Sequence, residues 1–281
     1  MAILTLKEIL DAAAARLAPS STARRDAELL LLRAVGRDRA WLLTHGDAEL
    51  PAEQREQFDA WVARRAQHEP VQYILGETEF YGLAMKVTPA VLIPRPETEH
   101  VVEETLRRAV REAALRICDV GTGSGALAVA LAQVLPQAQV TALDVSQAAL
   151  AAARENAERH GVAERVRCVE SDLLNAVEDE RFDLVVSNPP YVAEGENLEA
   201  QVREWEPHAA LFAGPTGLEV YERLIPQTWD VLVPGGWCLL EIGQGQREAL
   251  AHLLRRWDAV QFVADLQGIP RVAIARRGSG E

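Results

Sequence analysis

The spacing of apolar and polar residues changes character along the chain. Over residues 1–70, apolar side chains recur every three or four positions, which predicts helices. Thr5 and Glu8 form a capping-box pair at the start of the first helical stretch, and Pro51 suits the first turn of a later one. Gly36 ends a helical stretch between them. We therefore expect a small N-terminal helical bundle over residues 1–70.

The segment that follows has a different pattern. From Val71 to Val87 the spacing is typical of strands, with Gly76 and Gly82 as turn signals. This pattern predicts a β-hairpin. We assign residues 71–96 to a hairpin and linker that precede a second domain.

Residues 97–281 alternate between short apolar, β-branched runs and longer helical stretches. The runs predict strands over residues 116–120, 139–143, 166–169, 182–187, 237–242, 261–264 and 272–275. A helix is expected from residue 97 to about Ala114, and further helices separate the later strands. Such alternation is typical of a parallel sheet with helices on both faces. We predict an α/β fold with a Rossmann-like, mostly parallel seven-stranded sheet over residues 97–281.

Polar residues follow the first three of these strands, at the ends where open α/β sheets bind ligands. Asp144 ends the second strand, about 20 residues after a glycine-rich loop, which is the place for a carboxylate that holds a ribose diol. Asp172 and Leu173 follow the third strand and could flank an adenine ring. The glycine-rich loop after the first strand consists of Gly121, Thr122, Gly123, Ser124 and Gly125. Its spacing matches the dinucleotide-binding pattern only in part.

A stiff turn follows the fourth strand, residues 182–187, and consists of Asn188, Pro189, Pro190 and Tyr191. Two consecutive prolines fix φ and lack N–H groups, so the chain must leave the sheet in an extended conformation. The turn can present the Asn188 side-chain oxygen and the Pro189 carbonyl as acceptors for a substrate –NH2 group. An ordinary loop exit would use the same tetrapeptide, and the ligand-binding residues of the earlier strands favour the catalytic interpretation.

Two further segments have both a structural and a functional interpretation. Arg95 is held extended between two prolines, and Glu97 falls in the first turn of the following helix, where acidic side chains suit the helix dipole. These residues could bind substrate or simply begin a linker helix. Residues 193–206 carry five glutamates and one arginine. They could form a solvated connection or a loop that faces the substrate.

Composition narrows the class of protein. The chain has 281 residues and a net charge of −13, and residues 76–281 carry 19 basic and 31 acidic side chains. This acidity argues against a partner held through a phosphate backbone. No apolar run is long enough to span a membrane, and the first residues lack a signal-peptide pattern, so we expect a cytoplasmic protein. Cys118, Cys168 and Cys238 are isolated and show no metal-binding spacing, so we expect no metal.

The glycine-rich loop, Asp144 and the Asn-Pro-Pro-Tyr turn together resemble the class I S-adenosylmethionine-dependent methyltransferases that modify planar nitrogens. More of the chain is similar to one family of these enzymes, the release-factor glutamine methyltransferases. The segments that carry this similarity are the helical N-terminus and residues 80–82, 91–99, 206–212 and 240–243. Members of the family methylate the glutamine amide of the Gly-Gly-Gln loop in class I peptide-chain release factors.

The resemblance implies a role for each candidate residue. The glycines approach the methionine part of S-adenosyl-L-methionine, whose product is S-adenosyl-L-homocysteine, and Asp172 approaches the adenine amino group. Asn188 and the Pro189 carbonyl accept the substrate N–H groups, and Tyr191 packs against the amide plane. Arg95 and Glu97 are assigned to the substrate side. At Leu173 some relatives carry Trp, so the surface that stacks on adenine is thinner here.

The resemblance also implies a class I release factor as the protein partner, which the N-terminal bundle of residues 1–70 would dock. We expect a monomer without direct contact to nucleic acid or membrane. Two alternatives remain open. One is a ribosomal-protein glutamine methyltransferase or a nucleic-acid adenine-amino methyltransferase with the same Asn-Pro-Pro-Tyr site. The other is a non-catalytic adaptor with a vestigial cofactor fold, which the intact glycine-rich loop, Asp144 and Asn188 disfavour.

Overall fold

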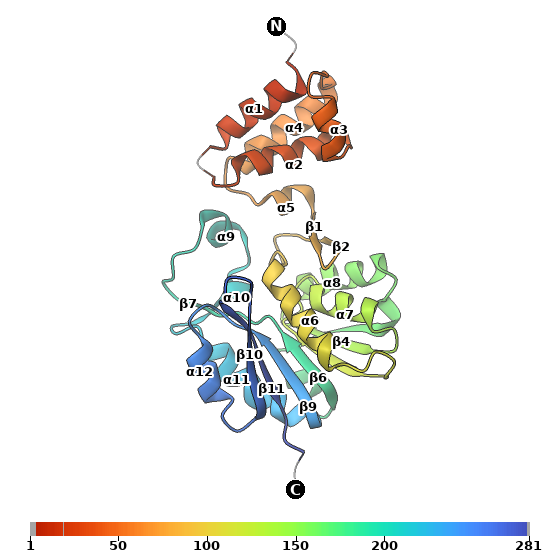
Figure 1. Cartoon of the computed structure of the whole chain (residues 1–281), viewed down its shortest axis with the longest axis vertical. Coiled ribbons are helices and arrows are strands. Elements are labelled where there is room, and N and C mark those ends of the chain that lie inside the picture. Colours follow the sequence, from red (N-terminus) through yellow and green to blue (C-terminus); the bar gives the residue numbers. More distant parts are fainter. Residues whose placement is uncertain (1–3, 19, 280–281) are drawn as a thin grey trace. The chain divides into compact units, whose positions relative to one another are not determined.

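The computed structural model of the chain describes residues 4–18 and 20–279 and divides into two compact units (Figure 1). The helical unit comprises Met1–Gly76 together with Leu198–Trp205. The sheet unit comprises Glu77–Asn197 and Glu206–Glu281.

The helical unit is built from amphipathic helices around one apolar core, as the sequence predicts. Thr5 and Glu8 form the predicted capping box at the start of α1, and Gly36 ends α2 in the left-handed conformation. Leucines of α1 and α2 pack with Phe58 of α4 in the core. The helices of this unit are α1 (Leu6–Arg16), α2 (Ala23–Val35), α3 (Arg39–Thr44), α4 (Ala52–Arg65), α5 (Val71–Leu75) and α9 (Ala200–Trp205).

A buried ion pair joins α2 to α4 within this unit. The Arg65 guanidinium donates from Nε to Asp26 Oδ2 at 2.7 Å, and it also donates to the Glu69 carbonyl at 3.3 Å. Its Nη2 donates to Gln201 Oε1 of α9 at 3.0 Å. Because Arg65 and Asp26 are only 5% and 7% exposed, both charges are largely shielded from water. The pair therefore fixes how these helices meet.

The predicted hairpin is present but shorter than the sequence suggests. Val71–Leu75 is helical rather than extended, and the hairpin consists of β1 (Glu77–Phe80) and β2 (Leu83–Lys86). Pro70 sets the start of the short helix, and Gly76 ends it with φ of 75°. Alternation over five residues does not separate a strand from one helical turn, which is why the pattern alone was wrong for this segment.

The sheet unit contains the predicted mostly parallel seven-stranded sheet. Its order is β10-β11-β9-β6-β3-β4-β5, in which β11 pairs antiparallel with both β9 and β10 and the other pairs are parallel. The strands are β3 (Arg116–Val120), β4 (Gln139–Asp144), β5 (Val166–Glu170), β6 (Phe182–Ser187), β9 (Leu232–Glu241), β10 (Asp258–Ala264) and β11 (Pro270–Arg276). A separate two-stranded sheet pairs β7 (Val192–Ala193) with β8 (Phe212–Gly214).

The helix predicted to reach Ala114 is shorter than expected, since α6 spans Glu99–Arg108 after a single 3-10 turn, Pro96–Thr98. Arg108 folds back and donates to both the carbonyl oxygen and the carboxylate of Glu104, at 2.9 and 2.6 Å. This side chain satisfies a carbonyl of the last turn, and Ala109 then turns into an extended conformation.

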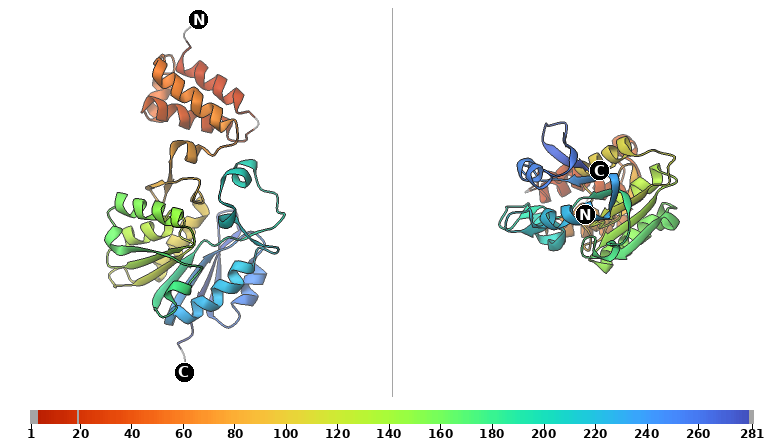
Figure 2. Two further views of the ribbon diagram at one scale, coloured as in Figure 1. Left: turned by 180° about the vertical axis from the view of Figure 1, so that it is seen from behind. Right: turned by 90° about the horizontal axis from the view of Figure 1, so that it is seen from below.

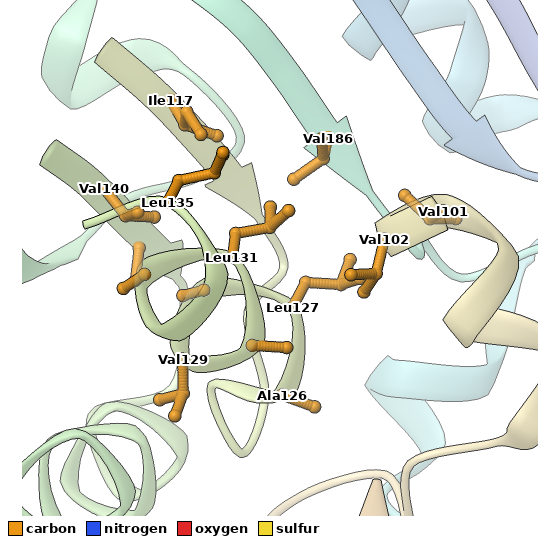
Figure 3. Close-up of a cluster of buried hydrophobic side chains, with 14 of the residues drawn as sticks. Val101, Val102, Ile117, Ala126, Leu127, Val129, Leu131, Leu135, Val140 and Val186 are labelled. Atoms are coloured by element: carbon orange, nitrogen blue, oxygen red, sulfur yellow. The ribbon is translucent and has the colours of Figure 1, made fainter. Parts of the chain in front are cut away.

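Helices cover both faces of the sheet (Figures 1 and 2). On one face, the mostly apolar helix α7 (Ala126–Val134) and its C-cap Leu135 bury Leu127, Leu131 and Leu135 near Ile117 and Val140 of the sheet (Figure 3). The helices of the unit are α6, α7 (Ala126–Val134), α8 (Gln147–Arg159), α10 (His208–Leu211), α11 (Glu219–Val231) and α12 (Arg247–Leu253). Because both faces are covered, the open positions of the sheet are its strand ends.

Replacing Arg65 with methionine should lower the free energy of unfolding by about 3 kcal/mol, because Asp26 would remain buried without its cation. Arg55 on the same helix forms an exposed pair with Asp59, and its replacement by methionine is the matched control, with an expected effect below about 0.5 kcal/mol. Urea unfolding followed by circular dichroism measures both. Equal effects of the two substitutions would contradict a structural role of the buried pair.

Candidate active site

A cavity of about 340 Å³ opens at the carboxyl ends of the central parallel strands. It brings together most of the residues that the sequence analysis singled out. Five of the predicted residues do not line it: Arg95, Glu97, Gly125, Pro189 and Tyr191. The predicted residues that line the cavity are Gly121, Thr122, Gly123, Ser124, Asp144, Asp172, Leu173, Asn188 and Pro190.

The register of the parallel strands explains this convergence. Val120 at the end of β3 pairs with Leu143 of β4 on one side and with Ser187 of β6 on the other. Asp144 pairs in turn with Glu170 of β5. The residues that follow each strand therefore emerge side by side at one edge of the sheet.

The three glycines of the loop each have positive φ, which an L-amino acid side chain disfavours. Gly121 and Gly123 have φ of 71° and 55°, and the space where a Cβ would stand is open within 4 Å. Gly125 differs, because its Cβ would lie 3.0 Å from Cβ of Ala153 in α8. Gly121 and Gly123 thus leave room for a ligand, whereas Gly125 permits close packing of the loop against α8.

The Asp144 carboxylate is oriented by backbone N–H groups on both of its oxygens. Oδ2 accepts from Gly123 N and Oδ1 accepts from Ser146 N, each at 2.9 Å. Each carboxylate oxygen retains capacity for a second hydrogen bond. The group lines the cavity and is suited to accept from two neighbouring hydroxyls, as a ribose diol requires.

Asp172 lines the cavity but already has a charged partner. Its Oδ2 is hydrogen-bonded to the Arg223 guanidinium of α11, a residue that the sequence analysis missed. Both side chains are about half exposed, at 52% and 53%. Leu173, the next residue, has φ of 52° and contributes apolar surface to the cavity. The predicted contact of Asp172 with an adenine amino group would therefore share the carboxylate with Arg223.

Asp119, the penultimate residue of β3, is the main cavity residue that the sequence analysis overlooked. It is 1% exposed, and its Oδ2 accepts from Thr122 Oγ1 at 2.6 Å and from Ala128 N at 3.2 Å. Its other oxygen, Oδ1, has no hydrogen-bond partner among the described residues. Burial raises the pKa of Asp119 to about 7, although the hydrogen bonds from Thr122 and Ala128 oppose this shift.

Asp119 lines the cavity and its unpartnered oxygen Oδ1 is buried, so a cationic group or an N–H donor that reaches this oxygen would satisfy it. A ligand with a ribose, a positively charged end and an apolar purine therefore fits this lining. The signal in the sequence was a lone carboxylate inside an otherwise apolar strand, directly before the glycine-rich loop.

Residues of other elements anchor the Asn-Pro-Pro-Tyr turn through hydrogen bonds. Asn188 Nδ2 donates to Thr98 Oγ1 at 3.1 Å, and the Tyr191 hydroxyl donates to Glu241 Oε1 at 3.4 Å. Gln246 Nε2 donates to the Tyr191 carbonyl at 2.9 Å. Burial raises the pKa of the Tyr191 phenol well above its usual range, so the hydroxyl stays protonated.

Arg95 forms part of the cavity framework. Its Nη2 donates to Glu206 Oε1 at 2.5 Å, and the other Glu206 oxygen accepts from Ile93 N at 3.2 Å. Glu206 is buried, and through Ile93 it links the segment that contributes Leu92 and Pro94 to the cavity lining with the lining residues Pro207, Ala209 and Ala210. Glu97 contributes its carbonyl oxygen to His100 Nδ1. A direct contact of Arg95 or Glu97 with substrate remains a prediction.

Within the described part of the chain, no group of three or more His, Cys, Asp or Glu side chains is arranged to hold a metal ion. None of the described helices is both long and apolar enough to cross a membrane.

Comparison with known proteins places the fold in the class of Rossmann-like methyltransferases. The family model "Methyltransferase small domain" matches residues 100–210, and "PrmC N-terminal domain" matches residues 8–76. A methyltransferase structure from Pyrococcus furiosus aligns with 81% of this chain and 100% of its own, with a TM-score of 0.52 and 20% identity. A T. thermophilus 16S rRNA methyltransferase in complex with AdoMet and guanosine aligns with 72% of this chain and 49% of its own, with a TM-score of 0.54 and 20% identity. These two structures establish the fold.

Full-length relatives narrow the class further. The release factor glutamine methyltransferase of Koribacter versatilis is 46% identical over 279 residues, which cover 98% of this chain and 99% of the relative. The protein of the same name from Geobacter sulfurreducens is 46% identical and covers 98% of both chains. The chain belongs to the release factor glutamine methyltransferase family.

Replacing Asp119 with asparagine should stabilise the ligand-free protein, and more so at higher pH. The pKa of this group is raised from 3.8 to about 7 in the folded state, so the folded protein binds the proton more tightly than the unfolded one. Wild-type stability from this group is present below pH 4 and is lost as the pH rises towards 7. Asparagine removes the charge and keeps an acceptor oxygen for Thr122 and Ala128.

The expected gain in unfolding free energy is on the order of 2–4 kcal/mol at pH 8 and much smaller at pH 5. Urea unfolding of both proteins at the two pH values measures it. A gain that does not depend on pH would argue against a buried charge at Asp119.

Proposed function

We propose that this protein transfers a methyl group from S-adenosyl-L-methionine to the side-chain amide nitrogen N5 of the glutamine in the Gly-Gly-Gln motif of class I peptide-chain release factors. The observation that carries this proposal is the Asn188 turn, which stands at the end of β6 beside the cavity and is anchored through Nδ2. The names of the full-length relatives support the same substrate and reaction. S-adenosyl-L-homocysteine is then the second product.

The cavity lining supports this cofactor. Asp144 would hold the ribose hydroxyls, and the open space above Gly121 and Gly123 would admit the methionine part. The unpartnered oxygen of Asp119 would face its positively charged end, and Leu173 would contact the adenine. When bound, the cofactor supplies a methyl group that is already activated on a sulfonium, so the chain needs no covalent nucleophile.

The chain's contribution to the reaction is orientation and polarisation of the substrate amide. An amide nitrogen is a weak nucleophile because its lone pair is delocalised into the carbonyl. The Asn188 Oδ1 atom and the Pro189 carbonyl would accept both N–H groups, which raises electron density on nitrogen and fixes the amide plane. Tyr191 would pack against that plane. The amide proton leaves after transfer, so no strong general base is required.

The charge of the chain suits a basic protein partner. Residues 76–281 carry 31 acidic against 19 basic side chains, so a release factor that binds the negatively charged ribosome would be attracted electrostatically. Transfer to a nucleic-acid adenine or a ribosomal protein is not favoured, because the full-length relatives are named for the release factor. We further propose that the protein is a cytoplasmic monomer and makes no direct contact with nucleic acid.

Incubation with S-adenosylmethionine and a purified class I release factor should add one methyl group to the factor, mapped by peptide fragmentation to the Gly-Gly-Gln glutamine. Asn188→Ala should lower turnover by about a hundredfold or more, because one acceptor of the substrate amide is removed, while cofactor affinity by calorimetry stays nearly intact. Transfer to another protein or to nucleic acid instead would refute the proposed substrate. A parallel loss of cofactor binding would mean that the role of Asn188 is wrong.

The helical unit holds no catalytic group in our assignment, and we propose that it docks the release factor. A protein lacking residues 1–70 should then lose activity on the whole factor by at least about tenfold more than on a short Gly-Gly-Gln peptide, because a distant contact is removed. Steady-state kinetics with both substrates, together with circular dichroism of the truncated protein, measure this. Equal losses on the two substrates would argue against docking.

A further inference from the structure

Glu241, the last residue of β9, is a buried carboxylate for which the proposed reaction has no direct use. It is 1% exposed, yet it makes contacts to two parts of the active-site framework. Thr98 Oγ1 donates to Oε2 at 2.5 Å, and the Tyr191 hydroxyl donates to Oε1 at 3.4 Å. Thr98 is itself 4% exposed and lines the cavity beside Asn188.

The contact between Thr98 and Glu241 determines which atom of Asn188 can face Thr98. A hydroxyl group has one proton, and that of Thr98 is given to the Glu241 carboxylate. The Thr98 oxygen can then only accept a second hydrogen bond. Of the two ends of the Asn188 amide, only Nδ2 is a donor, and it stands 3.1 Å from the Thr98 oxygen.

The orientation of this amide matters because its two ends have nearly the same shape and opposite polarity. With Nδ2 on Thr98, Oδ1 points away from Thr98 and can accept an N–H group of a substrate. A flipped amide would present its own N–H groups to the substrate –NH2 group, where donor would meet donor. The side chain alone does not favour either orientation.

We propose that Thr98 and Glu241 are positioning residues that fix the Asn188 amide in the orientation that presents Oδ1 to the substrate. This inference rests on the proposed function, because it gives Asn188 the role of acceptor for the amide N–H. It adds two residues that act through Asn188 and that touch neither the reacting nitrogen nor the transferred methyl group.

The protonation state of Glu241 gives the network a dependence on pH. Burial raises its pKa to about 7, the hydrogen bond from Thr98 lowers it, and the charge of Glu97 raises it. The hydrogen bond from Tyr191 and the charge of Arg271 lower it as well. A protonated Glu241 has a proton of its own to donate and no longer dictates where the Thr98 proton points. The hydrogen bonds from Asn188 to Thr98 and from Thr98 to Glu241 therefore have fixed directions above pH 7, and these directions are less well defined below it.

Substitutions at Thr98 test the proposal. Thr98→Val keeps the shape and removes the hydroxyl, and kcat on the release factor should fall by about tenfold to a hundredfold, while the dissociation constant of S-adenosylmethionine changes by less than about threefold. Thr98→Ser restores the hydroxyl and should return kcat to within about threefold of the wild type. Thr105→Val is the matched control. Thr105 lies within α6 and is buried like Thr98, but its hydroxyl donates to the Val101 carbonyl, at 2.7 Å, and not to the active-site framework.

A second variant tests the carboxylate. In Glu241→Gln the new side-chain amide can offer Thr98 either an acceptor or a donor, so kcat should fall. At saturating substrates, kcat of the wild type should decrease as the pH is lowered through 7, and kcat of Glu241→Gln should not. A Thr98→Val enzyme as active as Thr105→Val would overturn the proposal, and so would equal losses in Thr98→Val and Thr98→Ser. No transfer by the wild-type enzyme would instead refute the proposed function, and this inference with it.

Discussion

The site depends on the parallel pairing of β3 with β4 on one side and with β6 on the other. In this register the carboxyl ends of the three strands lie together, so the polar residues that follow them share one cavity. The apolar residues within each strand are buried beneath the helices on both faces. A shift of one residue in any of these pairs would turn core residues towards the wrong layer, so core packing also fixes the position of the cavity residues.

Two buried carboxyl groups show how the site departs from the needs of a stable core. Asp119 and Glu241 are each 1% exposed, and burial raises the pKa of both to about 7. In the absence of ligand, an apolar side chain at either position would give a more stable folded protein. Asp119 has an oxygen left for a ligand, and Glu241 orients the residues behind the Asn-Pro-Pro-Tyr turn. The unfavourable burial is thus concentrated where the proposed chemistry needs fixed charge and polarity.

The cavity residues that follow β3 and β4 could be predicted because their signals are local in sequence. Positive φ selects the glycines of the loop, and Asp144 directly ends an apolar strand, so each signal lies within a few residues of its cause. Thr98 and Glu241 left no such signal, since their hydrogen bond joins residues 143 positions apart. Arg223, which lies 51 positions from its partner Asp172, was missed for the same reason. Pairings of this kind depend on the completed fold.

Arg95 illustrates the difference between recognising a residue and assigning its role. The flanking prolines predicted an extended backbone at Arg95, which the structure has, and the resemblance assigned Arg95 to the substrate side. In the fold, Arg95 forms an ion pair with Glu206, whose carboxylate also accepts from Ile93 N, and a contact of Arg95 with substrate stays a prediction. Glu206 is 6% exposed, so its charge is uncompensated without Arg95. The extended segment between the two prolines therefore places Arg95 where it joins two segments of the cavity wall through Glu206.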